Sequence, residues 1–449
     1  MVTADKRTVP GVSKAVRRTS KEAAIVVALL GVALASRSVW IGMRFERLNV
    51  DRDAYLAISE QLSLGHGFSS DARAIPTAYR PPLYPLILAG LRCLPMQLPL
   101  AIAVLHLSLA VGTVLLTLKV GGALGLGKLR FLAAGIVALD PLLIHYCVLP
   151  MTETSCAFLG TWCLLSFVRL FQVDQSWRSQ AQAGIALGLA ALCRPTFWAF
   201  AVLMAVAFAV RAIVRPSELR TTGVRPFLGR LPWTTCLAAG LIVAPWAVRN
   251  AIVFGRPIVT TTHGGYTLLL GNNPVFYREV VRQPWGTVWG GESLSAWQHS
   301  LEADLLASGI APADEIERDR QLAAQARSTI THDPGMFLQA CWLRARRFFN
   351  ITPLTSGDAS LPPLVLFAVG GFNAIVFLTA ALGALRLRSL RKLGWVPVLF
   401  VLISFVLVHL VYWSNARMRG PVAPAIALLA AAALSRHSAS FAESRRAGP

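Results

Sequence analysis

A chain of 449 residues would allow two or three soluble domains, but 55% hydrophobic and only 14% charged residues are not the composition of soluble domains. Its apolar residues come in blocks of about 20, and the mean hydropathy of +0.56 agrees, so the sequence predicts an all-α polytopic membrane protein. Disordered, coiled-coil and collagen-like chains are excluded. The net charge of +21 would indicate a nucleic-acid partner in a soluble protein, but in a membrane protein it indicates orientation.

The apolar blocks predict ten membrane-spanning helices. In chain order they lie near residues 23–43, 97–118, 131–149, 153–172, 181–193, 195–214, 232–250, 362–384, 393–412 and 419–435.

Two of the apolar segments are unusual. The fifth predicted helix, 181–193, is short for a membrane core of about 30 Å, which takes about 20 residues. We therefore expect half of a bent pair that breaks at Arg194-Pro195. Residues 81–95 are also apolar, but three prolines and an arginine among them favour a short, partly inserted helix over a full span.

Basic residues collect on one side of this topology. If the N-terminal tail is cytoplasmic, the segments on that side hold 22 basic and 5 acidic residues, which accounts for +17 of the net charge. These segments are 1–22, 119–130, 173–180, 211–230, 386–392 and 436–449. The opposite loop of 255–350 carries nine basic and nine acidic residues. The positive-inside rule therefore places both ends of the chain in the cytoplasm.

The topology predicts five regions: a basic cytoplasmic tail, an N-terminal membrane module, a non-cytoplasmic loop region, the C-terminal transmembrane helices and a second cytoplasmic tail. Their limits are 1–22, 23–254, 255–361, 362–435 and 436–449.

Two non-cytoplasmic segments are large enough to build a site. The first is the loop 44–96, in which Tyr55, Ile58 and Leu62 recur at helical spacing and predict an amphipathic surface helix that ends at a Gly-His-Gly turn. The second is the loop 255–361, which contains a charged helical stretch near 312–330. Because the loop is rich in Gly and Trp, we expect a small region of mixed structure that leans on the membrane bundle.

Common cofactor signatures are missing from the sequence. It contains neither a phosphate-binding Walker loop nor a dinucleotide-binding fingerprint. The seven cysteines lie mostly inside predicted helices without metal-ligand spacing, so we interpret them as small apolar residues. No cofactor is predicted, and a divalent metal remains an open possibility without a ligand cluster to hold it.

The first candidate site lies in the loop 44–96. Asp51 and Asp53 follow the first helix, and Arg80 lies near the end of the loop. Carboxylates and a guanidinium in one cleft could abstract a proton and hold a phosphate. The alternative is a solvated loop with ordinary surface ion pairs.

The second candidate is Glu153, which follows a Leu-Pro-Met-Thr turn between the third and fourth predicted helices. The short turn keeps its carboxylate at the same outer surface. Its alternative role is structural, with Thr152 capping the fourth helix and Glu153 favouring the positive helix end.

The third candidate is a set of arginines at outer helix ends: Arg194, Arg249, Arg417 and Arg419. Positive charges on that side run against the positive-inside rule, so each needs an anionic partner. A lipid-linked phosphate would serve, and so would ordinary lipid headgroups.

The loop 255–361 adds polar and aromatic candidates. Asn272 and Asn273 could bind sugar hydroxyls on the acceptor side, or could simply form a turn. Trp285, Trp289 and Trp297 could stack on a sugar, but anchoring at the membrane interface is the favoured interpretation.

Eight short motifs follow one another along the chain. They are DRDAY at 51–55, LGHGF at 64–68, AYRPPLYP at 78–85, LPMTE at 149–153, GLAALCRP at 188–195, PWAVRN at 245–250, LGNNP at 270–274 and RMRGPVAP at 417–424. Taken in this order, the motifs resemble the C-type glycosyltransferase (GT-C) superfamily, integral-membrane enzymes that use polyprenyl-phosphate or dolichyl-phosphate sugars. The resemblance covers most of residues 45–430, and the chain is similar in particular to the branch containing the protein O-mannosyltransferases and the aminoarabinose transferases of lipid A.

The resemblance implies roles for several candidates. The family has a catalytic Asp four residues before a Tyr, which matches Asp51 and Tyr55, with Asp53 as a second choice. The family's basic residue before Pro-Pro-Leu-Tyr contacts the lipid phosphate, and Arg80 stands there. Glu153 corresponds to a second acidic residue of the family. Ala54 departs from relatives that have Arg before the Tyr.

The resemblance also implies a reaction. A sugar would pass, with inversion, from a polyprenyl-phosphate donor to a glycan, lipid or protein acceptor at the non-cytoplasmic face of a bacterial inner membrane. Asp51 would act as general base, Glu153 would orient the acceptor or a metal, and Arg80, Arg249 and Arg417 would stabilise the departing phosphate. The expected partners are the donor, the acceptor and membrane lipids, without nucleic acid.

Two other functions remain open. One is a transporter or flippase of a lipid-linked glycan, which would place charges at mid-membrane and show internal repeats. The other is a non-catalytic GT-C homologue that binds the donor. We see no repeat, and the candidate residues gather at one face, so an enzyme is favoured.

Overall fold

The computed structural model describes residues 10–71, 73–172, 176–214, 232–354, 362–390 and 393–435. Within these ranges the regular structure is helical and there is no strand. Ser69 and Pro76 form an isolated antiparallel β-bridge. The all-α class predicted from the sequence is confirmed.

Six helices are long and apolar enough to cross a membrane, which makes the chain a multi-pass integral membrane protein. They lie in α1 (Pro10–Met43), α4 (Leu98–Ala123), α7 (Glu153–Gln172), α10 (Trp233–Phe254), α16 (Pro363–Leu390) and α17 (Val396–Val411), the last together with the 3-10 helix η4 (Leu393–Trp395) that precedes it.

The other predicted spans are shorter helices. As expected, α8 (Trp177–Cys193) and α9 (Phe197–Val214) are separated at Arg194-Pro195. The predicted helix 131–149 is instead two helices, α5 (Leu129–Leu139) and α6 (Pro141–Tyr146). Asp140 causes this break together with the proline that follows it, because its carboxylate accepts a hydrogen bond from the Leu143 amide at 3.0 Å and caps α6.

The predicted last span is also divided. It begins as the 3-10 helix η5 (Ala416–Val422) and continues as α18 (Ala423–Ala432), whose residues are all buried. Close packing explains how so short a helix is enclosed: a Cβ at Gly383 of α16 would lie 1.9 Å from the Leu429 carbonyl oxygen. η5 and α18 are therefore surrounded by other helices.

The loop after α1 contains three short helices, η1 (Phe45–Asn49), α2 (Tyr55–Ser63) and α3 (Leu83–Arg92). The predicted amphipathic helix is α2, which buries Tyr55 and Ile58. It is followed by Gly65 at a φ of +79° and Gly67 at +78°, a left-handed backbone that glycine adopts without strain. The short helix expected within 81–95 is α3.

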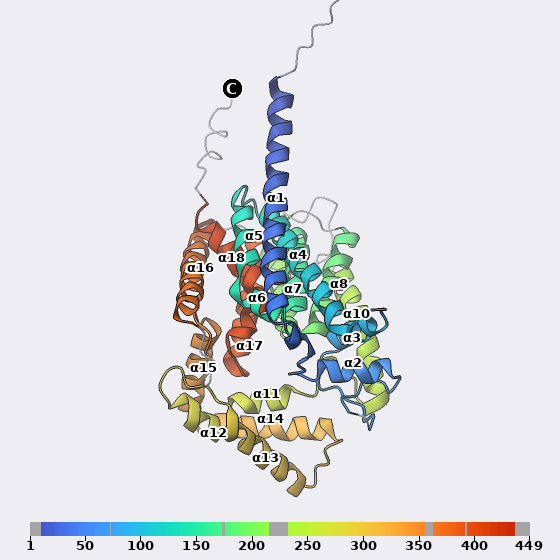
Figure 1. Cartoon of the computed structure of the whole chain (residues 1–449). Coiled ribbons are helices and arrows are strands. Elements are labelled where there is room, and N and C mark those ends of the chain that lie inside the picture. The colour runs from blue at the N-terminus through green and yellow to red at the C-terminus, as the bar shows by residue number, and fades with distance from the viewer. Residues whose placement is uncertain are drawn as a thin grey trace, which may run out of the picture.

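The region expected to have mixed structure is helical in its described residues, which corrects that prediction. Figure 1 shows α11, α12, α13 and α14 as a layer across one end of the bundle, with α15 leading back to it. The helices are α11 (Gly264–Gly271), α12 (Pro274–Phe276), the π-helical η3 (Tyr277–Val281), α13 (Gly291–Ala307), α14 (Glu315–His332) and α15 (Pro334–Phe348).

This outer layer has its own apolar core, and its tryptophans supply much of it. Trp289 and Trp297 are buried there beside Phe276 and Leu322, so they do not anchor at a lipid surface as favoured from the sequence. A tryptophan must be exposed to anchor at the membrane interface, and of the three tryptophans only Trp285 is exposed.

Arg344 should be essential to the attachment of the outer layer. It is buried and donates to the Gly271 carbonyl at 2.5 Å and to the Asn272 side-chain oxygen at 3.2 Å. We expect Arg344→Ala to lower the free energy of unfolding by about 3 kcal/mol, because it leaves buried acceptors unpaired. The exposed Arg346→Ala on the same helix is the control, and equal thermal unfolding of the two purified variants would contradict the prediction.

Candidate functional site

Five charged side chains meet at the end of the bundle that the outer layer covers. This charged cluster consists of Asp53, Arg80, Glu153, Arg194 and Arg417. They come from the residues before α2 and before α3, the first residue of α7, the break between α8 and α9, and η5. Segments far apart in the chain are therefore brought together by ion pairs.

Asp53 is held by two arginines. Its Oδ1 lies 3.2 Å from Arg80 Nη2, and its Oδ2 lies 2.6 Å from Arg417 Nη2. Arg80 Nε also donates to the Asp53 backbone carbonyl at 2.8 Å. Burial raises the pKa of the Asp53 carboxyl, but the Arg417 and Arg80 guanidiniums outweigh burial and hold that pKa below its usual range.

Glu153 forms the second half of the cluster. Its Oε1 accepts hydrogen bonds from Arg194 Nη2 at 2.7 Å and from Arg417 Nε, so Arg417 bridges both carboxylates. Arg194 also donates to the Thr152 hydroxyl at 3.2 Å. Glu153 Oε2 is buried and has no hydrogen-bond partner within the described chain.

Glu153 is the buried side of the cluster, and the other carboxylate and two of its arginines are partly accessible to solvent. The side chains of Asp53, Arg80 and Arg417 are 15%, 16% and 17% exposed, whereas that of Glu153 is 1% exposed. Two carboxylates meet three guanidiniums, so the cluster carries one excess positive charge. The accessible groups are therefore the ones that could receive an anion.

Tyr55 lies under the cluster. It is buried, the Arg80 guanidinium lies 5.6 Å from the centre of its ring, and Tyr84 packs edge-on at 5.3 Å. Ala54, which precedes it, has a left-handed φ of +61° that turns the chain between Asp53 and α2. Burial raises the pKa of the Tyr55 phenol, which keeps it protonated at neutral pH.

Asp51, the first choice for a catalytic base, lies outside the cluster. It is exposed, and its Oδ2 accepts the Ala57 amide at 2.8 Å, an amide in the first turn of α2 that has no helical partner. Asp53, the second choice, has the position that was expected of Asp51.

Two of the four outer arginines, Arg194 and Arg417, join the cluster, and the other two bind backbone. Arg249 donates to the carbonyls of Thr77 at 2.8 Å and Phe68 at 3.1 Å, which fastens the first outer loop to α10. Arg419 is buried and donates to the Asn350 carbonyl at 2.6 Å.

Asn272 and Asn273 are also buried in structural contacts. The amide group of Asn272 donates to the carbonyls of Leu268 and Val411, both at 2.8 Å. Asn273 caps α12 by accepting the Phe276 amide at 2.8 Å. These contacts agree with the turn-forming alternative, because they leave neither side chain exposed to bind a sugar.

The sequence did not identify three residues beside the cluster, Tyr79, His263 and Glu315. Arg80 lies 4.5 Å from the centre of the Tyr79 ring, and His263 packs against Tyr79 at 4.0 Å. Glu315 binds the loop residues just before Tyr79 and the residue just before His263. The three residues belong to different segments. Tyr79 stands in the AYRPPLYP motif and Glu315 in the charged stretch near 312–330, but neither signal pointed to a partner.

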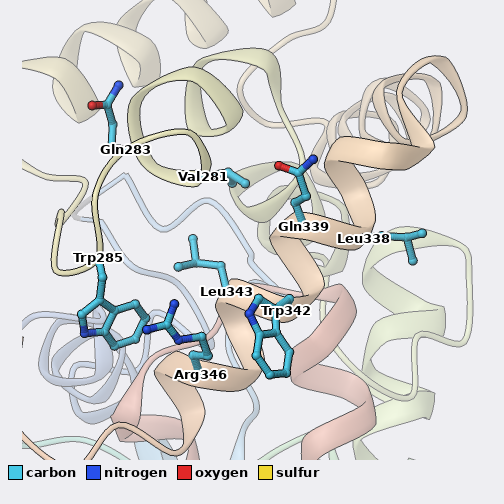
Figure 2. A pocket seen from close by; sticks show the side chains of 8 residues that line it. All are labelled: Val281, Gln283, Trp285, Leu338, Gln339, Trp342, Leu343 and Arg346. Carbon is cyan, nitrogen blue, oxygen red and sulfur yellow. The ribbon is translucent and has the colours of Figure 1, made fainter.

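A groove of about 420 Å³ lies elsewhere, between the end of η3 and α15 (Figure 2). Trp285 and Trp342 line it, and the Arg346 guanidinium stacks on Trp285 at 4.0 Å. Of the candidate residues, Trp285 lines this groove, and none of the candidate charged residues or asparagines does. Among the described residues, no group of three or more His, Cys, Asp or Glu side chains is placed to hold a metal ion.

No family model and no curated protein sequence matches the chain. Solved structures do. One is the oligosaccharyltransferase AglB from Archaeoglobus fulgidus, in complex with an inhibitory peptide and a dolichol-phosphate, with 13% identity and a TM-score of 0.48 over 90% of this chain and 50% of AglB. Another is ArnT from Cupriavidus metallidurans bound to undecaprenyl phosphate, with 17% identity and a TM-score of 0.39 over 91% of this chain and 77% of ArnT. The chain thus spans about half the length of AglB.

The low pKa of Asp53 predicts a pH-dependent contribution to stability. A carboxylate whose pKa is lower when folded stabilises the fold above its unfolded pKa of about 3.9, and this stabilisation is lost as the pH falls through the folded pKa. We expect Asp53→Asn to unfold at a lower temperature than the wild type at pH 7. The difference should shrink as the pH falls below about 4. A difference that is constant with pH would show that the ion pairs are not its source.

Proposed function

We propose that the protein is a membrane glycosyltransferase of the GT-C type, which transfers a sugar from a polyprenyl-phosphate donor to an acceptor hydroxyl, with inversion. The observation that carries this proposal is the charged cluster, in which a carboxylate and two arginines are accessible at one end of a membrane bundle. The cluster unites residues from five of the eight motifs in which the resemblance to that superfamily resides.

Arg80 and Arg417 supply the phosphate site. Guanidinium groups bind phosphate through paired charge-assisted hydrogen bonds, and both side chains are partly exposed. The excess positive charge of the cluster favours an anionic ligand and stabilises the negative charge that develops on a departing phosphate. Arg194 supports this charge from the buried side of the cluster.

Asp53 is the general base in this proposal. It takes the proton from the acceptor hydroxyl while the acceptor oxygen bonds to the anomeric carbon. At the same time the bond from that carbon to the phosphate oxygen breaks, and polyprenyl phosphate leaves with the electron pair. Asp53 is a weak base while two guanidiniums hold it. A bound donor phosphate competes for those guanidiniums and thereby raises the basicity of Asp53.

Glu153 is a positioning residue. Its Oε1 holds Arg417 and Arg194, which keeps Arg417 beside Asp53, and its small exposure leaves it out of reach of a bulky acceptor. The accessible cluster and the outer layer lie on the non-cytoplasmic side in the charge-based topology, in keeping with a cell membrane whose donor sugar faces outward.

The acid–base step gives the sharpest test. We expect purified Asp53→Asn to release polyprenyl phosphate from a sugar-bearing donor at least about 100-fold more slowly than the wild type, because the base is lost. Asp51→Asn, two residues away, should keep activity within about threefold, because an asparagine oxygen can still accept the Ala57 amide. Loss of activity in Asp51→Asn with near-normal turnover in Asp53→Asn would reverse the assignment.

Arg80 should act mainly on the donor. We expect Arg80→Ala to weaken donor binding by about tenfold or more, because a charge-assisted contact to phosphate is lost. Arg73→Ala is the control, since Arg73 is exposed in the same loop and pairs only with Asp71 among the described residues. If wild-type protein moves the donor across a vesicle membrane without cleaving it, the protein is a transporter and the proposed transfer is wrong.

A further inference from the structure

Three aromatic rings extend from the charged cluster into the outer layer. Tyr79 lies against Arg80, with 4.5 Å between the guanidinium and the ring centre. His263 follows at 4.0 Å from Tyr79, and Tyr266 stacks on His263 at 5.0 Å with an angle of 21° between the rings. We call Tyr79, His263 and Tyr266 the aromatic platform.

The aromatic platform is not ordinary core. All three side chains are partly exposed, whereas Trp297, the next ring beyond Tyr266 at 6.2 Å, is buried in the outer-layer core. Aromatic side chains that are only partly buried can still present apolar surface to a ligand.

His263 adds a polar group to the aromatic platform. Its Nδ1 is shielded from solvent and has no hydrogen-bond partner within the described chain. Burial, with the nearby Arg80 charge, lowers the pKa of His263 to about 3, so the imidazole is neutral at neutral pH. A neutral imidazole has one donor and one acceptor nitrogen, which suits a hydroxyl ligand better than an anion.

Glu315 joins the two halves of the aromatic platform. Its carboxylate accepts the Thr77 hydroxyl and the Ala78 amide, the latter at 2.9 Å, just before Tyr79. It also accepts the Thr262 hydroxyl at 2.7 Å, just before His263. The Thr262 amide donates directly to the Ala78 carbonyl at 3.0 Å. The rings are thus assembled before any ligand binds, which lowers the entropic cost of binding.

We propose that the aromatic platform binds the sugar of the donor, an inference that rests on the proposed function. A sugar has an apolar C–H face, which packs on aromatic rings, and hydroxyls, which pair with groups such as the His263 imidazole. The platform begins at Arg80. A sugar attached to a phosphate held by Arg80 therefore lies over Tyr79 and His263, with its anomeric carbon toward Asp53.

The test separates sugar binding from phosphate binding. The probes are a short-chain polyprenyl phosphate without sugar and the same lipid carrying a hexose, a pentose or an aminopentose. The variants are His263→Ala, Tyr266→Leu and His263→Phe, of which the last keeps a ring but loses the nitrogens. His299→Phe, at an exposed histidine of α13, is the control. Affinities are measured with the purified full-length protein.

We expect wild type and His299→Phe to bind one of the sugar-bearing lipids more tightly than the sugar-free lipid. His263→Ala and Tyr266→Leu should lose about tenfold in affinity for that lipid, and His263→Phe about threefold to tenfold. Affinity for the sugar-free lipid should stay within about twofold in every variant.

Other outcomes would overturn the inference in distinguishable ways. Equal losses for both kinds of lipid would mean that the aromatic platform only supports Arg80. Unchanged affinities, or a wild type that prefers no sugar-bearing lipid, would mean that the rings are packing and not a sugar site. A wild type that binds neither kind of lipid would overturn the proposed function itself.

Discussion

The site depends on one interaction, the bridge that Arg417 makes between Asp53 and Glu153. Each carboxylate belongs to a different structural unit, the first outer loop and the start of α7, and Arg417 belongs to a third, η5. Buried charges are stable only when paired, so the bridge constrains all three units together. Arg80 pairs with Asp53 and Arg194 pairs with Glu153 at the two ends of the bridge, and the position of Asp53 follows from this arrangement.

Two charged side chains fix the outer layer to its neighbouring segments. Glu315 at the start of α14 holds the loop that leads into Arg80, and Arg344 on α15 holds the turn at the end of α11. In both places one charged side chain binds backbone groups of another segment. Such contacts fix the positions of loops without burying a large apolar surface. The outer layer can therefore shape the charged cluster even though its own apolar core lies elsewhere.

Sequence reasoning succeeded where the information was local. The break at Arg194-Pro195 and the amphipathic helix α2 follow from a proline and from helical spacing, and the charge patterns identified all five members of the charged cluster as candidates. It failed where partners are distant. Asp51 and Asp53 are two residues apart and look alike in sequence, and the two arginines that distinguish Asp53 lie 27 and 364 residues away from it. In the outer layer the sequence predicted the charged helix near 312–330, which is α14, but the other helices were missed because glycines and tryptophans obscure the helical pattern.

The place of η5 in the chain has a consequence for synthesis. Four members of the charged cluster leave the ribosome before Arg417, which lies in η5 with only α18 after it among the described helices. An unfinished chain in the membrane therefore carries two carboxylates and two cations of the cluster but lacks the bridge that organises them. The charged cluster is therefore complete only when the last helices insert, so an incomplete chain would lack the proposed phosphate site.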